Sequence, residues 1–372
     1  MPAPGGGASL AALSSSDTRG VALTPAKSTM PDLLSTLPPL REWTGVDRGS
    51  FEAEILPSNE PAILRGLVDH WPAVRRGRES GLAIAQYLAA MDNGSPVTAL
   101  MTPPEEEGRI FYDASMAGFN YLRNSLTLSQ VLEQVMRYSN FERAPAVAVQ
   151  SALIPDCLPG FTDQNVLSLL DATVKPRLWF GTAITTPAHF DESHNVACCV
   201  AGRRRFTLFP IEQVANLYVG PLDHAPAGTP LSLVDFAKPD FDRFPRFRAA
   251  LAHARTAVLE PGDAIYMPPL WWHHVQSLER VNMLVNYWWM RAAPGHAKPP
   301  FAFDSLLHAV AALRGLPPEQ RRAWREVFDH YVFDTERDVT GHIPPERQSL
   351  LGPMSAEQQA KVRAELLKRL GG

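Results

Sequence analysis

Positions 185–192 read Thr185-Thr186-Pro187-Ala188-His189-Phe190-Asp191-Glu192. In an extended strand, residues i and i+2 share a face, so His189 and Asp191 point together while Phe190 points away. An imidazole and a carboxylate side by side can take two adjacent positions on one metal ion. The motif is short, however, and it fits equally a histidine that is held by a structural carboxylate.

A second histidine-bearing stretch lies farther along the chain. It reads Pro261-Gly262-Asp263-Ala264-Ile265-Tyr266-Met267-Pro268-Pro269-Leu270-Trp271-Trp272-His273-His274 and predicts a tight turn, a strand and a proline-interrupted loop. A third ligand from this stretch would complete two histidines and one carboxylate, an arrangement with open positions that is typical of non-haem iron(II) oxygenases. Only one of His273 and His274 can face the metal side of a strand, and spacing alone does not choose between them.

Short β-like runs separated by glycine and proline surround these two stretches. Many short strands with polar turns indicate a sandwich or a barrel, and the jelly roll is one such closure. We therefore expect a mainly β fold with flanking helices, built as a double-stranded β-helix. The expected strands lie at about 145–151, 177–185, 195–201, 205–210, 256–260, 263–267, 274–278 and 281–289, with a further short strand at 61–66.

The remainder of the chain divides into a leader, helices within the main domain and a helical end. Residues 1–38 are rich in Gly, Ser, Ala and Pro and are expected to be a disordered leader. The main domain is expected at 39–298, with helices at 81–91 and after a capping box formed by Thr127 and Gln130.

The C-terminal segment, 299–372, is expected to be helical. Ser305 is a candidate cap for a first helix, and Ser355 with Gln358 forms a capping box for a last one. Between them, Trp324, Val327, Phe328 and Tyr331 form an apolar stripe at helical spacing. Packing within the chain accounts for these helices, and they are also a candidate surface for a homodimer.

Composition narrows the classes of partner and compartment. The chain has 372 residues, a formal net charge of −4 and three cysteines. This charge gives no reason to expect a nucleic-acid or membrane partner, and no run of 18 or more apolar residues suggests a membrane helix. Three cysteines cannot form a disulfide framework, and strand geometry would turn the adjacent Cys198 and Cys199 to opposite faces as buried free thiols. A cytoplasmic location fits these features.

Taken in order, the motifs from about Trp179 to Met290 resemble the JmjC/cupin-like 2-oxoglutarate oxygenases, and in particular the asparaginyl hydroxylases among them. The N-terminal Pro61–Gly66 and Trp71-Pro72 also resemble the opening of that family. The matching stretches are Thr186–Glu192, Asn195, Gly202, Leu208–Pro210, Val234–Phe236, Pro239-Asp240, Arg243–Pro245, Pro261–Asp263, Trp271–His274 and Asn286–Trp288.

The resemblance implies the roles of individual residues. It selects His273 over His274 as the third ligand, so that iron(II) would be held by His189, Asp191 and His273. It also implies a set of pocket residues. Thr186 would hydrogen-bond the co-substrate 2-oxoglutarate, Asn195 and Asn286 would line the metal and co-substrate pocket, and Trp288 would approach the substrate.

Two positions depart from the family pattern. Arg204, within Arg203-Arg204-Arg205, stands where this subfamily has a lysine that binds the distal carboxylate of 2-oxoglutarate. Arginine can pair with a carboxylate through two hydrogen bonds, so we expect Arg204 to be the anchor in a pocket of different depth. Ala148 aligns with a tyrosine that binds the co-substrate in the related hydroxylases.

The activity that the resemblance implies is hydroxylation of a protein or peptide side chain, with dioxygen and 2-oxoglutarate consumed and succinate and carbon dioxide released. Residues 220–250, rich in Pro, Asp and Phe, are expected to form a loop beside the mouth of the site. Trp179 is one candidate for its walls. Two alternatives remain: a cupin that uses another divalent metal without 2-oxoglutarate, and a non-catalytic cupin-like binding protein.

Overall fold

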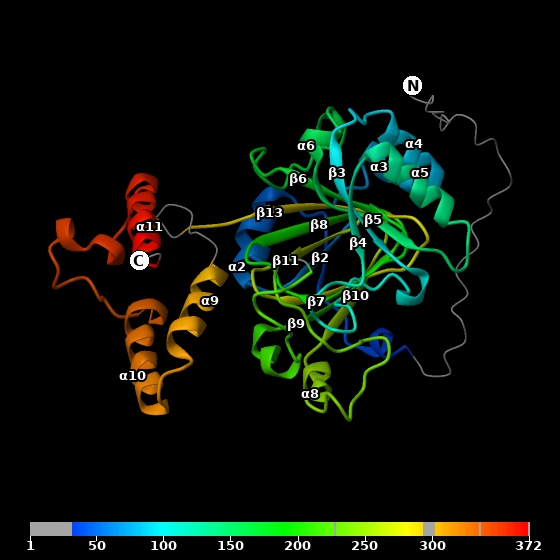
Figure 1. Ribbon diagram of the computed structural model, residues 1–372. Coiled ribbons are helices and arrows are strands. Elements are labelled where there is room, and N and C mark those ends of the chain that lie inside the picture. Colours follow the sequence, from blue (N-terminus) through cyan, green and yellow to red (C-terminus); the bar gives the residue numbers. More distant parts are fainter. Residues whose placement is uncertain (1–31, 227, 293–301, 335, 371–372) are drawn as a thin grey trace, which may run out of the picture. The chain divides into compact units, whose positions relative to one another are not determined.

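The structure is a computed structural model that describes residues 32–226, 228–292, 302–334 and 336–370. The chain divides into two compact units, Met1–Trp289 and Met290–Gly372, coloured blue to yellow and yellow to red in Figure 1. The expected leader lies mostly outside the described residues. Its last part, residues 32–38, contains instead a 3-10 turn at Leu33–Thr36 (η2), because the buried side chain of Leu34 and the Asp32 cap fix it.

Two β-sheets form the first unit. The described strands are antiparallel to their neighbours except for β1, which runs parallel to β2. The larger sheet has the order β1 (Glu42–Thr44), β2 (Ala62–Arg65), β11 (Ala264–Met267), β8 (His194–Ala201), β13 (Asn282–Trp289), β6 (Pro176–Gly181), β5 (Ala146–Leu153), β3 (Pro96–Thr102) and β4 (Leu122–Thr127). The smaller sheet has the order β10 (Arg255–Leu259), β9 (Arg204–Phe209), β12 (Trp272–Ser277) and β7 (Thr185–His189). This is the expected mainly β jelly roll.

The expected strands are confirmed to within a few residues, with one correction. The run 177–185 is two strands, β6 and the start of β7, because the chain leaves the larger sheet after Gly181 and enters the smaller one at Thr185. Strands β3 and β4 were not expected from the sequence. They extend the larger sheet beyond β5.

Helices cover the outer face of the larger sheet (Figure 1). The capping box at Thr127 and Gln130 is confirmed, since each side chain accepts a hydrogen bond from the other residue's backbone N–H. The main helices are α3 (Pro72–Glu79), α4 (Gly81–Ala89), α5 (Leu128–Tyr138), α6 (Ile154–Cys157), α7 (Phe161–Gln164) and α8 (Phe247–Ala252). Shorter ones are α1 (Arg48–Ser50), η3 (Phe51–Ile55), α2 (Leu56–Ser58), η4 (Pro104–Glu106) and η5 (Ile211–Asn216).

Two apolar clusters hold these layers together. The larger joins the helices to the outer face of the nine-stranded sheet, and it includes Cys198. The second lies between strands of both sheets and includes Cys199, Phe206 and Leu284. The adjacent cysteines therefore face opposite ways as buried free thiols, which confirms the expectation from strand geometry.

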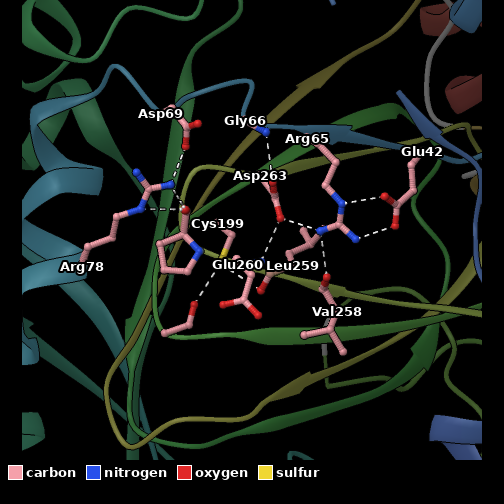
Figure 2. A network of polar contacts seen from close by, with 12 residues as sticks. Glu42, Arg65, Gly66, Asp69, Arg78, Cys199, Val258, Leu259, Glu260 and Asp263 are labelled. Atoms are coloured by element: carbon pink, nitrogen blue, oxygen red, sulfur yellow. Dashed lines mark hydrogen bonds and ion pairs between the residues drawn. The ribbon is translucent and has the colours of Figure 1, made fainter. Parts of the chain in front are cut away.

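The Pro261–Asp263 turn is fixed by a network of charged groups that Figure 2 shows. The Asp263 carboxylate accepts hydrogen bonds from Arg65 Nη1 at 2.5 Å and from the backbone N–H of Gly66 at 3.0 Å. Arg65 in turn binds both carboxylate oxygens of Glu42, at 3.1 and 2.6 Å. Strands β1 and β2 are thereby tied to the turn that precedes β11.

The second unit is helical. The capping box of Ser355 and Gln358 is confirmed by bonds of 2.8 and 3.3 Å, whereas Ser305 lies inside its helix, which begins at Ala302 and not at the expected cap. No helix in the described part of the chain combines the length and the apolar character needed to cross a bilayer. The elements are α9 (Ala302–Leu313), α10 (Pro318–Phe328), η6 (Asp329–Phe333), η7 (Pro345–Arg347), η8 (Ser349–Leu351) and α11 (Ala356–Leu370).

Candidate metal and co-substrate site

Three side chains converge where β7 and β12 lie side by side. His189, at the end of β7, is the register partner of His273 in β12, and Asp191 lies two residues beyond the end of β7. Their ligand atoms all lie within 4.8 Å of one another, and His273 Nε2 is 3.7 Å from Asp191 Oδ2. Two imidazoles and one carboxylate at this separation form a donor set that fits a divalent transition metal.

Both histidines are oriented by their own backbone. His189 Nδ1 lies 2.9 Å from the carbonyl oxygen of Pro187, and His273 Nδ1 lies 2.9 Å from that of Trp271. A ring that donates from Nδ1 keeps Nε2 free as a lone-pair ligand. Burial, and to a smaller extent the neighbouring His273, lower the pKa of His189 to about 4, so the ring is neutral near pH 7.

The side chains of His273 and His274 point to opposite faces of β12. His274 is buried against the ring of Phe236, with the ring centroids 4.7 Å apart. Burial lowers the pKa of His274 to about 3. His273, and not His274, joins the cluster with His189 and Asp191. The face of β12 on which each side chain lies therefore selects His273, a choice that spacing alone left open.

A chain of hydrogen bonds leads away from Asp191. Asn195 Nδ2 donates to Asp191 Oδ2 at 3.0 Å, and Asn286 Nδ2 donates to Asn195 Oδ1 at 3.0 Å. Both asparagines are buried, on the neighbouring strands β8 and β13. The side-chain oxygen of Asn286, Oδ1, is buried and has no hydrogen-bond partner.

A cavity adjoins the three converging side chains. All eight residues singled out in the sequence line it: Thr186, His189, Asp191, Asn195, Arg204, His273, Asn286 and Trp288. Sequence reasoning missed other lining residues, among them Gln150, Pro226 and Leu231. The last two belong to the loop expected at 220–250, so this loop does reach the cavity.

Arg204 brings a buried cation to this cavity. It is 4% exposed, its Nε has no hydrogen-bond partner, and no described carboxylate forms an ion pair with it. Burial lowers its pKa to about 10, so the guanidinium remains charged at neutral pH. A buried cation without a counter-charge is costly. The cavity is therefore suited to an anionic ligand such as a carboxylate.

Another part of the lining comes from β5, where Ala148 contributes no polar group. The register between β5 and β6 shifts between Val149 and Ala152, and Ser151 adopts a left-handed backbone conformation with φ +54°. Such a bulge redirects side chains beside functional sites. Gln150 lies at this bulge and lines the cavity. Alternation along the expected strand 145–151 would have placed it on the same face as Ala148.

Comparison with known proteins gives several partial matches. Lysine-specific demethylase 8 of Xenopus tropicalis is 26% identical over 247 residues, which cover 64% of this chain and 50% of that protein. HSPB1-associated protein 1 of Homo sapiens is 35% identical over 168 residues, covering 44% and 32%. Jumonji C domain-containing protein 5 of Drosophila melanogaster is 25% identical over 240 residues, covering 64% and 57%. The chain thus spans between about a third and just over half of these relatives.

The family described as the cupin-like domain matches residues 48–293, which is well over half of the chain. This range contains both sheets except for β1, and it contains every residue of the cavity named above. Two of the similar proteins are named for JmjC domains, the Drosophila melanogaster protein and JmjC domain-containing protein F of Dictyostelium discoideum. The chain therefore belongs to the cupin-like domain family of the JmjC type.

Proposed function

We propose that this chain is an iron(II)- and 2-oxoglutarate-dependent oxygenase that hydroxylates a side chain of a protein or peptide. One observation carries the proposal: a cluster of two histidines and a carboxylate opens on the same cavity as Arg204, a buried cation without a counter-charge. A metal that binds without an anionic co-substrate would leave Arg204 unexplained. A binding protein without chemistry would leave the metal donor set unexplained.

His189, Asp191 and His273 would hold the iron and leave positions open on its other side. Asn195 keeps the Asp191 carboxylate in place, and the backbone carbonyls of Pro187 and Trp271 keep the imidazole rings in place. When bound, iron(II) together with dioxygen and 2-oxoglutarate supplies the oxidation that turns a C–H bond into C–OH, with succinate and carbon dioxide as the other products.

Arg204 would bind the distal carboxylate of 2-oxoglutarate, which has the opposite charge and the planar shape of a guanidinium. Thr186 lies on β7 next to the metal ligands and offers a hydroxyl donor to the same co-substrate. Because Arg204 is buried, a carboxylate beside it is shielded from water, and their attraction is stronger than at a surface.

The substrate side chain would enter past Trp288 and the loop that carries Pro226 and Leu231. Trp288 Nε1 is buried without a partner and is a donor that a polar substrate group could use. Because some relatives are named lysine-specific demethylases, an N-methyl carbon is the main alternative target of the hydroxylation. Hydroxylation there would release formaldehyde, so a formaldehyde assay with a methylated and an unmethylated peptide distinguishes the two substrate classes.

The test is succinate formation from 2-oxoglutarate by purified protein with iron(II), ascorbate and dioxygen. His189→Ala removes a metal ligand and should abolish succinate, whereas His253→Ala, at an exposed histidine, should not change it. Succinate that persists in His189→Ala would contradict the proposed site. Metal binding without 2-oxoglutarate binding would favour a cupin that uses another divalent metal, and binding of 2-oxoglutarate without turnover would favour a non-catalytic protein.

We also propose that the second unit associates with a second copy of the chain. None of the described residues of α9, α10 and α11 is buried, so these helices lack a core of their own. A self-complementary apolar surface is the usual basis of a symmetric dimer. Exposed large apolar side chains of this unit are Leu306, Trp324, Val327, Tyr331, Val332, Phe333, Leu350, Leu366, Leu367 and Leu370.

A further inference from the structure

The wall of the cavity holds one donor that the proposed function leaves unassigned. Trp179, in β6, lines the cavity, and its indole Nε1 is buried without an acceptor. Buried indole N–H groups normally have a partner, because an unmet donor costs free energy. We propose that Trp179 binds the distal carboxylate of 2-oxoglutarate together with Arg204. This assignment rests on the proposed function and names a further residue that positions its co-substrate.

The strand pairing in the larger sheet indicates which end of the bound 2-oxoglutarate would lie near Trp179. Trp179 is paired with Leu284 of β13, and Leu284 is paired with Cys199 of β8. Cys199 and Leu284 belong to the apolar cluster between the sheets, against which Trp179 packs. Trp179, Leu284 and Arg204 all line the cavity, so Trp179 belongs to the row of residues that shares this part of the lining with Arg204.

A second unpartnered indole of the cavity lining starts closer to the metal ligands. Trp288 is paired with Asn195, whose amide donates to the Asp191 carboxylate. The two indoles meet edge to face, with centroids 6.5 Å apart and planes at 85°, so each restrains the other's ring. Because the rings touch and Trp288 is assigned to the substrate, the control for Trp179 is a tryptophan that does not line the cavity, Trp43 of β1.

The neighbouring wall leaves room for this role. Ala148 of β5 is paired with Gly181, two residues after Trp179 on β6. A Cβ on Gly181 would lie 2.6 Å from the Ala148 Cβ, so the backbones approach closely there. Neither residue offers a polar side chain. A carboxylate beside Arg204 gains no donor from these two residues, whereas the Trp179 N–H in the same cavity is buried and unused.

The experiment is calorimetric titration of 2-oxoglutarate into full-length protein loaded with Mn(II), in the wild type, Trp179→Phe and Trp43→Phe. Phenylalanine keeps an aromatic ring and removes the N–H. Loss of a hydrogen bond to a charged group should weaken binding in Trp179→Phe by roughly tenfold or more. Trp43→Phe, outside the cavity, should stay within about twofold of the wild type. The analogue 2-oxobutyrate, which lacks the distal carboxylate, should bind wild type and Trp179→Phe equally.

The outcomes separate this inference from the proposed function. Unchanged 2-oxoglutarate binding in Trp179→Phe, or equal weakening in both variants, would overturn the role of Trp179 and leave the oxygenase proposal intact. A wild type that does not bind 2-oxoglutarate would overturn both. Weakening of 2-oxobutyrate as strongly as 2-oxoglutarate would mean a packing defect and would overturn the inference. Trp179→His, which keeps a ring N–H, should recover part of the lost affinity.

Discussion

The amide of Asn195 holds the carboxylate of Asp191 by a hydrogen bond of 3.0 Å, and it is itself held by Asn286. The two asparagines come from adjacent strands of the larger sheet, β8 and β13, whereas His189 and His273 lie on the smaller sheet. The geometry of the metal cluster therefore depends on how the two sheets are placed against each other. The packing of the two sheets and the geometry of the metal ligands are coupled through the Asn195 side chain.

We expect Asn195→Ala to weaken metal binding by about 10- to 100-fold, because groups that orient a metal ligand commonly have effects of that size. The measurement is Mn(II) affinity by calorimetry, with Asn140→Ala at an exposed position as the control. Metal affinity equal to that of the wild type would mean that Asp191 is held in place without Asn195.

Arg204→Met should reduce 2-oxoglutarate affinity by about 100-fold or more, because it removes a buried, charge-assisted pair. Arg204→Lys should retain part of the affinity, since it keeps the charge but not the planar fork. The matched control is Arg203→Met. Arg203 is its exposed neighbour and pairs with Glu279, and its loss should leave affinity unchanged. Equal effects at both positions would contradict the anchor assignment.

The sequence predicts the parts of this protein that depend on local pattern. Alternation at His189 and Asp191 placed them on one side, and turn residues such as Pro261–Asp263 marked the strand ends correctly. The switch between sheets after Gly181 carries no local signal, so the run 177–185 was read as one strand.

Contacts between distant segments were beyond sequence reasoning. The link from Asp191 to Asn286 spans two strands, and the lack of a counter-charge at Arg204 depends on every element around it. Alternation from Ala148 would have pointed to Gln150, but the bulge at Ser151 that ends this part of the strand was not foreseen. A bulge has no recognisable sequence pattern when its left-handed residue, here Ser151, is not a glycine.

Gly262→Ala should destabilise the first unit by about 1–3 kcal/mol, because backbone strain adds to the displacement of the half-exposed Asp69–Arg78 pair. Gly262 has φ +107°, and a Cβ there would collide with the Asp69 carboxylate and lie 2.5 Å from Arg78 Nη2. Gly94→Ala is the control, since Gly94 has φ +77° and nothing within 4 Å of its Cβ. Strain alone should cost about 1 kcal/mol there. Urea unfolding measures the free energy of unfolding of both variants. An equal loss in Gly262→Ala and Gly94→Ala would show that the steric contact at Gly262 costs nothing.

The thiol of Cys157 should resist alkylation in the folded protein. Burial raises its pKa from 9.0 to about 11, so at pH 8 the reactive thiolate is about a hundredfold scarcer than in the unfolded chain. Because the shift is upward, the reaction rate should keep rising with pH through about 11. Iodoacetamide labelling followed by mass spectrometry measures the rate, with the urea-unfolded protein as the control. Equal rates in both states would show that the thiol is accessible.

Trp324→Glu should convert a dimer to a monomer, because it puts a charge into an apolar stripe on α10. Trp324, Val327 and Tyr331 follow helical spacing and are 44%, 43% and 51% exposed within a single chain. Sedimentation velocity of the full chain measures the mass, and Gln320→Glu on the same helix is the control for added negative charge. A wild type that sediments as a monomer at all soluble concentrations would rule out self-association. A dimer that survives Trp324→Glu would place the contact elsewhere on the chain.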